Sequence, residues 1–451
     1  MKTAFAHIDA VYFIGIGGIG MSALASYFNS HGYTVGGYDK TPSVITRQLE
    51  TQGVTIHYQD LGSAIPSPFD NKEVTLVVYT PAIPKDFKEM LHFRESGYPI
   101  KKRAEVLGVI ANSATCLAVA GTRGKTTTAS ILGHLLAATG APVTAFVGGV
   151  TNNYGGNLIQ QGDEVIVVEA DEFDRSFLQL RPDMLCVTSM DADHLDIYED
   201  AQALEDTFKE FAALTDPLNR FIAKGLPIKG NTVGIENDAD YCAKNITIND
   251  GCYLFDLEYP KGVIKNLHFN LPGWHNLTNA VTALGMALAY GSPTDQLPKA
   301  LASYTGVNRR FSYRVKSDDL IVIDDYAHHP TEIDAVFQSV SQMYPKEKVL
   351  AIFQPHLYSR TRDFMGAFAK ALSNFDEVAL LEIYPARELP IDGVSSAVLL
   401  EQITAPKKSL VDKGQLVAKV QQATQKIIVF MGAGDIGVEV IKVTETLQNA
   451  D

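Results

Sequence analysis

The chain has 451 residues, a net charge of −14 at neutral pH and 20% charged residues. This length exceeds what one hydrophobic core organises, so we expect about three domains. The acidic balance argues against a nucleic-acid or anionic-membrane surface, so an anionic substrate must be bound by local groups. The sequence contains no membrane-span pattern and no secretory signal at its N-terminus, which predicts a cytoplasmic location.

The first predicted unit opens with a strand at residues 11–14 that runs into a glycine-rich turn. Its G-x-G-x-x-G spacing comes from Gly15, Gly17, Gly18 and Gly20. Such a turn points backbone N–H groups and a helix N-terminus at a diphosphate. A second strand at residues 34–38 ends in Asp39, whose carboxylate can bind a ribose hydroxyl. The pattern predicts a Rossmann-type nucleotide-binding domain; alternatively, the glycines serve only a tight strand–helix turn.

The second unit begins with an apolar strand at residues 117–120, a short loop and a helix. Gly121 and Gly124 allow the loop to turn its amides toward an anion, Lys125 can reach the β- and γ-phosphates, and Thr126 can bind Mg²⁺. The strict phosphate-loop pattern has a glycine where this chain has Val119, so the match is to the shorter G-x-x-G-K-T form. The alternative is a turn with an exposed lysine.

Two later strands of this unit carry acids at their carboxyl ends. Glu169 and three further acids follow the apolar run 165–168, and Asp191, Asp193 and His194 follow the run that starts at Met184. Acid-bearing strand ends beside a phosphate loop suit a Mg²⁺–nucleotide site. Alternatively, both clusters are solvated loops with helix caps.

A long helix is predicted after the Pro-Gly pair at 272–273. Its start carries His275, Asn276 and Asn279, which can read an adenine edge or can cap the helix, and the sequence leaves both readings open.

The third unit repeats the strand-and-turn pattern. Strands at 320–325 and 350–353 lead into side chains that form an anion-binding rim, and a last strand ends in a second G-x-G-x-x-G turn at 432–437. The rim carries Tyr326, His328, His329, His356, Arg360 and Arg362.

We therefore predict an α/β protein with three domains at residues 1–106, 107–308 and 309–451. These are a Rossmann-like domain, a central phosphate-loop domain and a second Rossmann-like domain. The four cysteines lack C-x-x-C spacing, which predicts free thiols.

Several of these segments together resemble the Mur ligase family over essentially the full length. They are Gly121-Thr-Arg-Gly-Lys-Thr-Thr-Thr128, Glu169-Ala-Asp-Glu172, Asp193-His194, Leu271-Pro-Gly-x-His-Asn-x-x-Asn279 and Asp324-Asp-Tyr-Ala-His-His-Pro-Thr331. Two more, at residues 13–22 and 353–362, resemble the member that adds the first amino acid of the peptidoglycan peptide. One departure is Arg123, where the family usually has histidine.

The resemblance implies an ATP-dependent ligase that joins L-alanine to the carboxylate of UDP-N-acetylmuramate through an acyl phosphate. Magnesium, as two ions, is the implied metal cofactor. The implied phosphate-binding residues are Gly121, Thr122, Gly124, Lys125, Thr126 and Thr127. One Mg²⁺ is implied at Thr126 and Glu169, and a second at Glu169 and His194.

The resemblance also implies the remaining binding residues. His275, Asn276 and Asn279 frame the adenine, and Arg309 or Arg310 reaches a phosphate. The glycine turn at 15–20 and Asp39 seat the UDP group. Tyr326, His329, His356 and Arg360 seat the alanine carboxylate and orient its amine. Because these ligands come from three domains, we expect a hinge closure that assembles the site. A monomer or homodimer is expected.

Three rival functions remain open. An NAD-dependent oxidoreductase accounts for the glycine turn and Asp39 but leaves Lys125, the acidic strand ends and the third unit without a role. A non-catalytic nucleotide-binding regulator is favoured if Arg123 prevents ATP hydrolysis. A sister ligase that adds another amino acid or a peptide differs only by small changes in the acceptor pocket.

Overall fold

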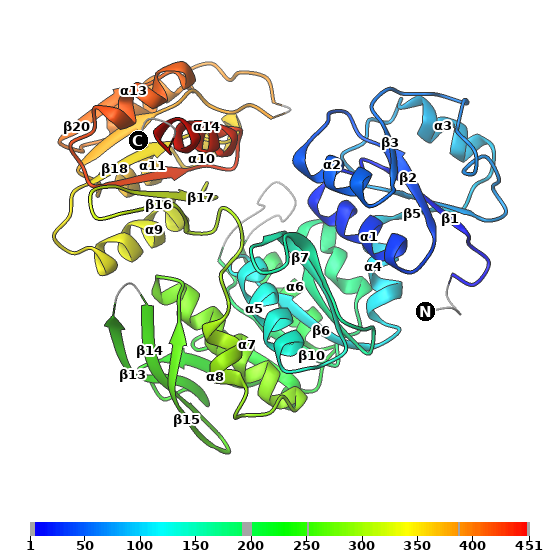
Figure 1. The fold of residues 1–451 in the computed structure, drawn as a ribbon, viewed down its shortest axis with the longest axis horizontal. Coiled ribbons are helices and arrows are strands. Elements are labelled where there is room, and N and C mark those ends of the chain that lie inside the picture. Colours follow the sequence, from blue (N-terminus) through cyan, green and yellow to red (C-terminus); the bar gives the residue numbers. More distant parts are fainter. Residues whose placement is uncertain (1–4, 192–200, 250–251, 387, 449–451) are drawn as a thin grey trace. The chain divides into compact units, whose positions relative to one another are not determined.

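The computed structural model describes residues 5–191, 201–249, 252–386 and 388–448, and its strands form three sheets (Figure 1). The chain divides into two compact units. The first contains residues 1–246, 255–269 and 278–305, and the second contains residues 247–254, 270–277 and 306–451. The predicted α/β class with parallel sheets is confirmed, whereas the predicted domain boundaries remain a prediction.

The N-terminal sheet has five parallel strands in the order β3-β2-β1-β4-β5. Its central strand β1 is buried throughout, as expected for an apolar strand with helices on both faces. The strands are β1 (Ala10–Ile14), β2 (Thr34–Tyr38), β3 (Thr55–His57), β4 (Thr75–Tyr79) and β5 (Ile100–Lys102). The helices are α1 (Ile19–Ser30), α2 (Val44–Thr51), α3 (Lys88–Glu95) and α4 (Arg103–Ala111).

The middle sheet has ten strands in the order β15-β14-β13-β12-β11-β10-β6-β9-β7-β8. The apolar strand β6 lies between β9 and β10 and is parallel to both, so the carboxyl ends of these three strands meet at one edge. The strands around it are β6 (Thr115–Ala120), β7 (Val143–Thr151), β8 (Gly156–Gln160), β9 (Val165–Ala170) and β10 (Met184–Val187).

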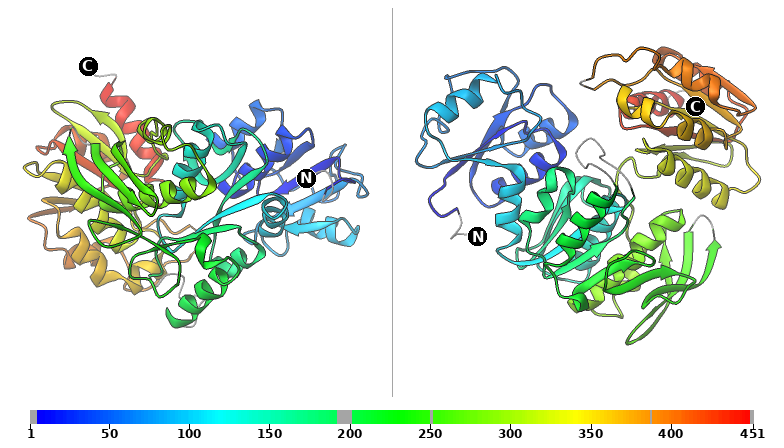
Figure 2. Two further views of the ribbon diagram at one scale, coloured as in Figure 1. Left: turned by 90° about the horizontal axis from the view of Figure 1, so that it is seen from below. Right: turned by 180° about the vertical axis from the view of Figure 1, so that it is seen from behind.

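The remaining strands of this sheet are β11 (Arg220–Ala223), β12 (Asn231–Ile235), β13 (Tyr241–Asn249), β14 (Cys252–Tyr259) and β15 (Gly262–Phe269). The helices are α5 (Lys125–Ala138), α6 (Ala201–Ala212), α7 (Trp274–Tyr290) and α8 (Leu297–Ala302), with 3₁₀ turns η1 (Phe173–Gln179) and η2 (Pro217–Asn219). Helix α7 packs closely on the sheet, because a Cβ built on Gly285 would contact Phe221 of β11 and Tyr241 of β13. Helix α8 packs on β15 in the same part of the chain (green ribbon, Figure 2).

The C-terminal sheet has six strands in the order β16-β17-β21-β18-β19-β20, and only β16 is antiparallel. Separate apolar clusters cover its two faces. The strands are β16 (Ser312–Lys316), β17 (Ile321–Asp325), β18 (Val349–Phe353), β19 (Glu377–Leu380), β20 (Lys407–Leu410) and β21 (Ile427–Met431). The helices are α9 (Pro330–Met343), α10 (Tyr358–Asp363), α11 (Met365–Leu372), α12 (Ser396–Gln402), α13 (Leu416–Gln421) and α14 (Ile436–Gln448), with the 3₁₀ turn η3 (Lys413–Gln415).

Two further sequence expectations concern cysteines and membrane spans. All four cysteines are free, and Cys116, Cys186 and Cys242 are buried, which confirms the prediction of free thiols. Among the described residues, no helix is both long and apolar enough to cross a membrane.

Candidate active site

The loop between β6 and α5 has the predicted phosphate-loop geometry. Gly121 and Gly124 have φ angles of 134° and 81°, which favour glycine. Gly124 is the N-cap residue of α5, and no side chain caps this helix. The first turn of α5 therefore presents backbone N–H groups and the positive end of the helix dipole, as an anion site requires.

The loop is fixed to the segment that follows β10. The Thr122 amide donates to the Ser189 carbonyl at 3.1 Å, and the Arg123 amide donates to Ser189 Oγ at 2.8 Å. The Thr188 hydroxyl donates to the Arg123 carbonyl. A Cβ built on Gly121 would lie 2.2 Å from Thr188 Oγ1, so only glycine fits this contact. These bonds hold the loop backbone in place without using the amides at the start of α5.

The Lys125 ammonium lies over this loop. Its Nζ donates to the Gly121 carbonyl at 2.6 Å and to both carboxylate oxygens of Glu172, at 2.9 and 2.8 Å. The Glu172 side chain is fully buried, and burial raises its pKa while the neighbouring ammonium opposes that shift. The lysine is therefore ordered rather than extended into solvent.

Oxygen donors that suit Mg²⁺ lie on two neighbouring elements. Glu169 is the penultimate residue of β9, and its Oε1 accepts a hydrogen bond from the Gly148 amide at 2.6 Å. The Thr126 hydroxyl, in the first turn of α5, makes no hydrogen bond with any described residue. Carboxylate and hydroxyl oxygens are the hard donors that Mg²⁺ prefers, so this pair fits the metal. His194, the other predicted ligand, lies outside the described residues.

Other acids at these strand ends pair with arginines. Asp191 lies 3.2 Å from Arg123, and Asp171 lies 3.4 Å from Arg103. Within the described ranges, no three His, Cys, Asp or Glu side chains gather into a group that could hold a metal ion. Any metal here would rely on few protein ligands, as Mg²⁺ does when it binds nucleotide phosphates.

The three predicted adenine-binding residues fall in different surroundings. Asn279 lies against the phosphate loop, since a Cβ built on Gly124 would be 2.6 Å from its Oδ1. In the second unit, the buried Asn276 amide donates to the Pro272 carbonyl at 2.6 Å, which supports the helix start. His275 is exposed. The Asn276 amide thus has a structural contact within its own helix start, but this donation to a carbonyl is not a cap, which would accept a backbone N–H.

The N-terminal glycine turn also leads into an uncapped helix. Gly18 is the N-cap of α1, and no side chain caps it. Asp39 Oδ2 accepts the Gly17 amide at 2.7 Å, so this carboxylate supports the turn in addition to any contact with ribose. Sequence reasoning missed Arg103, whose Nη1 would lie 2.7 Å from a Cβ on Gly20. Its position after Lys101 and Lys102 was the available signal.

The second compact unit, which contains the C-terminal sheet, places the predicted anion-binding residues at the carboxyl edge of that sheet. The His356 ring stacks on Tyr384 at a centroid distance of 5.6 Å, and the His328 ring is 6.2 Å away. His356 Nδ1 has no hydrogen-bond partner among the described residues. Burial first, then His328 and Arg360, lower the pKa of His356 to about 4, opposed by Glu388. This histidine is neutral at physiological pH.

The arginines of this unit differ in whether their guanidinium groups are hydrogen-bonded to the protein. Arg309 donates to Asp324 at 3.2 Å and to the Gly432 carbonyl at 2.5 Å, so it stabilises the unit. Arg310 lies over the Tyr326 ring at 5.2 Å, and its guanidinium has no hydrogen bond to a described residue. The Arg360 guanidinium likewise has none, and His329 Nδ1 lies 2.9 Å from Thr331 Oγ1.

Comparisons with known proteins agree with this architecture. Family models match residues 10–115 (Mur ligase family, catalytic domain), 119–287 (Mur ligase middle domain) and 309–438 (Mur ligase, glutamate ligase domain). A protein of Christiangramia forsetii named UDP-N-acetylmuramate–L-alanine ligase is 56% identical over 98% of both chains. A protein of Flavobacterium psychrophilum with the same name is 56% identical over 98% of both.

A solved structure of a similar ligase has the same fold as this chain. The UDP-N-acetylmuramate-alanine ligase of Thermotoga maritima has a TM-score of 0.84 and 28% identity, covering 98% of this chain and all of that one. The chain belongs to the Mur ligase family.

Proposed function

We propose that the protein joins L-alanine to the carboxylate of UDP-N-acetylmuramate, with ATP converted to ADP and phosphate, in cytoplasmic peptidoglycan precursor synthesis. The observation that carries this proposal is the full-length identity of 56% to two proteins named for this reaction. The phosphate loop with Lys125 held above it supports the ATP-dependent part.

The sugar carboxylate attacks the γ-phosphate of ATP to give an acyl phosphate, and the amine of L-alanine then displaces phosphate to give the amide. Both steps depend mainly on positioning and on charge neutralisation. Lys125 and the loop residues Gly121, Thr122, Gly124 and Thr127 hold the phosphates. Asn279 is the adenine-side residue nearest the loop, with His275 and Asn276 as further candidates.

Magnesium supplies the charge neutralisation that brings two anions together in such a reaction. Thr126 and Glu169 are the residues that hold one ion, with His194 as the candidate for a second. The Gly148 amide orients the Glu169 carboxylate, which reduces the ordering required when a ligand binds.

The glycine turn at 15–20 takes the diphosphate of the UDP group, because α1 begins there without a side-chain cap. Arg103, in van der Waals range of this turn, adds a positive charge. Asp39 contributes to the ribose side. Arg310, rather than the internally bonded Arg309, is available to reach a phosphate.

The amino-acid end lies in the second unit, where His356, Arg360, Tyr326 and His329 are the candidate contacts. The Arg360 guanidinium can bind the alanine carboxylate, since it makes no hydrogen bond within the described chain. A neutral His356 can accept a hydrogen bond from the amine without repelling it. We expect a monomer or homodimer, which light scattering measures.

The test is phosphate release from Mg²⁺-ATP with UDP-N-acetylmuramate, run separately with L-alanine, glycine, L-serine and a peptide. Each substrate is also omitted in turn. Release that requires both the sugar nucleotide and L-alanine is the expected result. Release with a peptide but not with alanine would indicate a sister ligase. No release with ATP still bound would favour a nucleotide-binding regulator.

A further inference from the structure

Two acids near the carboxyl end of β9, Glu169 within the strand and Glu172 after it, bond to different parts of the protein. Strands β6 and β9 pair in parallel, with Val119 opposite Glu169, so their carboxyl ends lie side by side. Glu169 bonds the Gly148 amide of β7. Glu172, the residue before η1, instead bonds the phosphate-loop lysine. The carboxyl end of β9 therefore supplies one acid to β7 and another to the phosphate-loop lysine.

The bond to Lys125 is bidentate and shielded from solvent. Both carboxylate oxygens of Glu172 lie within 2.9 Å of Nζ, and the exposed fractions of the two side chains are 18% for Lys125 and 0% for Glu172. A shielded pair is weakened little by water or salt, so it can hold a long, flexible side chain in one place.

The third contact of the ammonium places it over the loop. Nζ also donates to the carbonyl of Gly121, the first loop glycine. An ammonium has three N–H donors, and here they point at the Gly121 carbonyl and the two oxygens of Glu172. One of the two N–H groups that face the carboxylate can be shared with an incoming phosphate oxygen. The lysine is thus held beside the uncapped first turn of α5, where phosphate oxygens are expected to bind.

We propose that Glu172 is a positioning residue, whose buried carboxylate holds the Lys125 ammonium over the loop before the nucleotide arrives. This inference rests on the proposed function, because it assumes that the loop binds the phosphates of ATP. Glu172 acts only through Lys125. Its removal leaves the lysine free to swing away from the loop, so ATP binds more weakly and the phosphoryl group is transferred more slowly.

A double-mutant cycle tests this coupling. The variants are Glu172→Gln, Lys125→Met and the double variant, with Mg²⁺-ATP binding measured by calorimetry. In the Lys125 background, Glu172→Gln should weaken ATP binding about tenfold or more, because the ammonium is no longer fixed. In the Lys125→Met background the same change should alter the affinity less than about twofold. Equal effects in both backgrounds would overturn the proposal.

Thermal unfolding separates this role from a structural one. Lys125→Met removes the ammonium from a buried carboxylate, so its melting temperature should fall, and Glu172→Gln added to it should restore part of the loss. Glu172→Asp, which keeps the charge but retracts it, should retain more ATP affinity than Glu172→Gln. A Glu172→Asp variant no better than Glu172→Gln would contradict the role of the charge.

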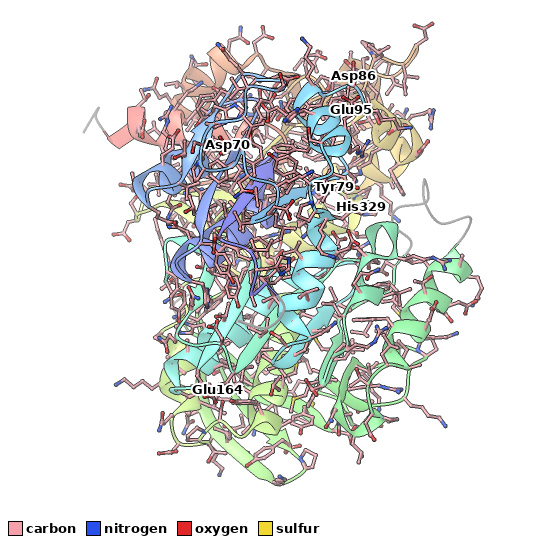
Figure 3. The ribbon with its side chains drawn as sticks, turned by 90° about the vertical axis from the view of Figure 1, so that its right-hand side faces the viewer. Asp70, Tyr79, Asp86, Glu95, Glu164 and His329 are labelled. Atoms are coloured by element: carbon pink, nitrogen blue, oxygen red, sulfur yellow. The ribbon has the colours of Figure 1, made fainter. Side chains whose placement is uncertain are left out.

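Glu164→Gln is the matched control. Glu164 is exposed (Figure 3). It precedes β9, at the opposite end of the strand from Glu169. It should bind ATP as the unaltered protein does. Because the calorimetric cycle needs no acceptor substrate, it reports on Glu172 even if no acceptor supports phosphate release, so failure of the proposed ligase reaction is a separate result.

Discussion

The two G-x-G-x-x-G turns of this chain differ in what meets the helix that follows. At 15–20, α1 begins at Gly18 without a side-chain cap. At 432–437, the Ile436 amide at the start of α14 donates to Gln354 Oε1 at 3.0 Å, and Gln354 Nε2 donates to Asp435 at 2.8 Å. One helix start is open to an anion, whereas the other is closed by the protein itself.

The space over the C-terminal turn is filled as well. A Cβ built on Gly434 would lie 2.5 Å from Gln354 Oε1, and one built on Gly437 would lie 2.5 Å from the Arg309 guanidinium carbon. These glycines make room for side chains of the same unit. The same spacing of glycines therefore leaves one helix start open and serves packing at another, and the phosphate loop at 121–124 resembles the open case.

The largest effect should come from the metal-binding acid beside the open phosphate loop. Glu169→Ala removes a carboxylate that we assign to Mg²⁺, and turnover should fall at least about 100-fold. Phosphate release measures this, and thermal unfolding checks that the fold survives. Glu164→Ala is the matched control at the other end of β9. Ligase activity retained in Glu169→Ala would remove the metal assignment.

The second effect concerns the shape of the open loop. Gly124→Ala places a Cβ 2.6 Å from Asn279 Oδ1 at a φ of +81°, so ATP affinity should fall about tenfold or more. Calorimetry with ATP is the measurement. Gly140→Ala is the control, because Gly140 has a φ of +84° but open space around it. A similar loss of affinity in both variants would show that backbone strain, and not the contact with Asn279, lowers the ATP affinity.

The third effect is a pH dependence of the stability of the unit that contains the closed turn at 432–437. The pKa of His356 is lowered to about 4 from 6.5, by burial and by His328 and Arg360, against Glu388. The unfolded chain takes up this proton near pH 6.5 and the folded chain only near pH 4, so stability is lost as pH falls between these values.

Thermal unfolding at a series of pH values tests this expectation. The unaltered protein should lose more stability over that interval than His356→Gln, which cannot titrate. Parallel curves for the two proteins would show that His356 is not the responsible group.

The fourth effect tests the cap of the closed helix. Gln354→Ala removes the buried side chain that bonds Ile436 and Asp435, so the free energy of unfolding should fall by about 2 kcal/mol. Denaturant unfolding measures this, with the exposed Gln402→Ala as the control. ATP affinity should not change. A loss of ATP affinity in Gln354→Ala would indicate that this turn also serves the nucleotide.

The smallest effect concerns the unusual residue of the phosphate loop. Arg123 and Asp191 form an ion pair whose side chains are 27% and 54% exposed, and exposed pairs contribute little. Arg123→His should change the free energy of unfolding by less than about 1 kcal/mol and turnover by less than about threefold. A larger loss of turnover with unchanged stability would mean that the Arg123 side chain contacts the nucleotide.

Local patterns predicted most elements near the site. The strands ending at Ile14, Ala120 and Asp325 were expected because apolar runs bounded by glycines or acids are typical of buried parallel strands. A helix after the phosphate loop was also expected, since helix-forming residues follow Gly124, and α5 begins there. Such features depend on residues close together in the chain.

Contacts between distant segments could not be predicted in this way. The sequence offered Asp39 for ribose, but the fold also gives it the Gly17 amide. It placed Glu172 among four acids without distinguishing it, and only the pairing of β6 with β9 brings it to Lys125. Nor could it show that the Asn276 amide donates to the Pro272 carbonyl.

The sequence by itself therefore determined the class of fold, the family and the positions of the glycine-rich turns, because glycine and lysine spacing acts over a few residues. The tertiary structure decided which turn is open, which arginine is available and which acid holds the lysine. Those outcomes depend on side chains supplied by other strands, and their approach is fixed only when the sheets assemble.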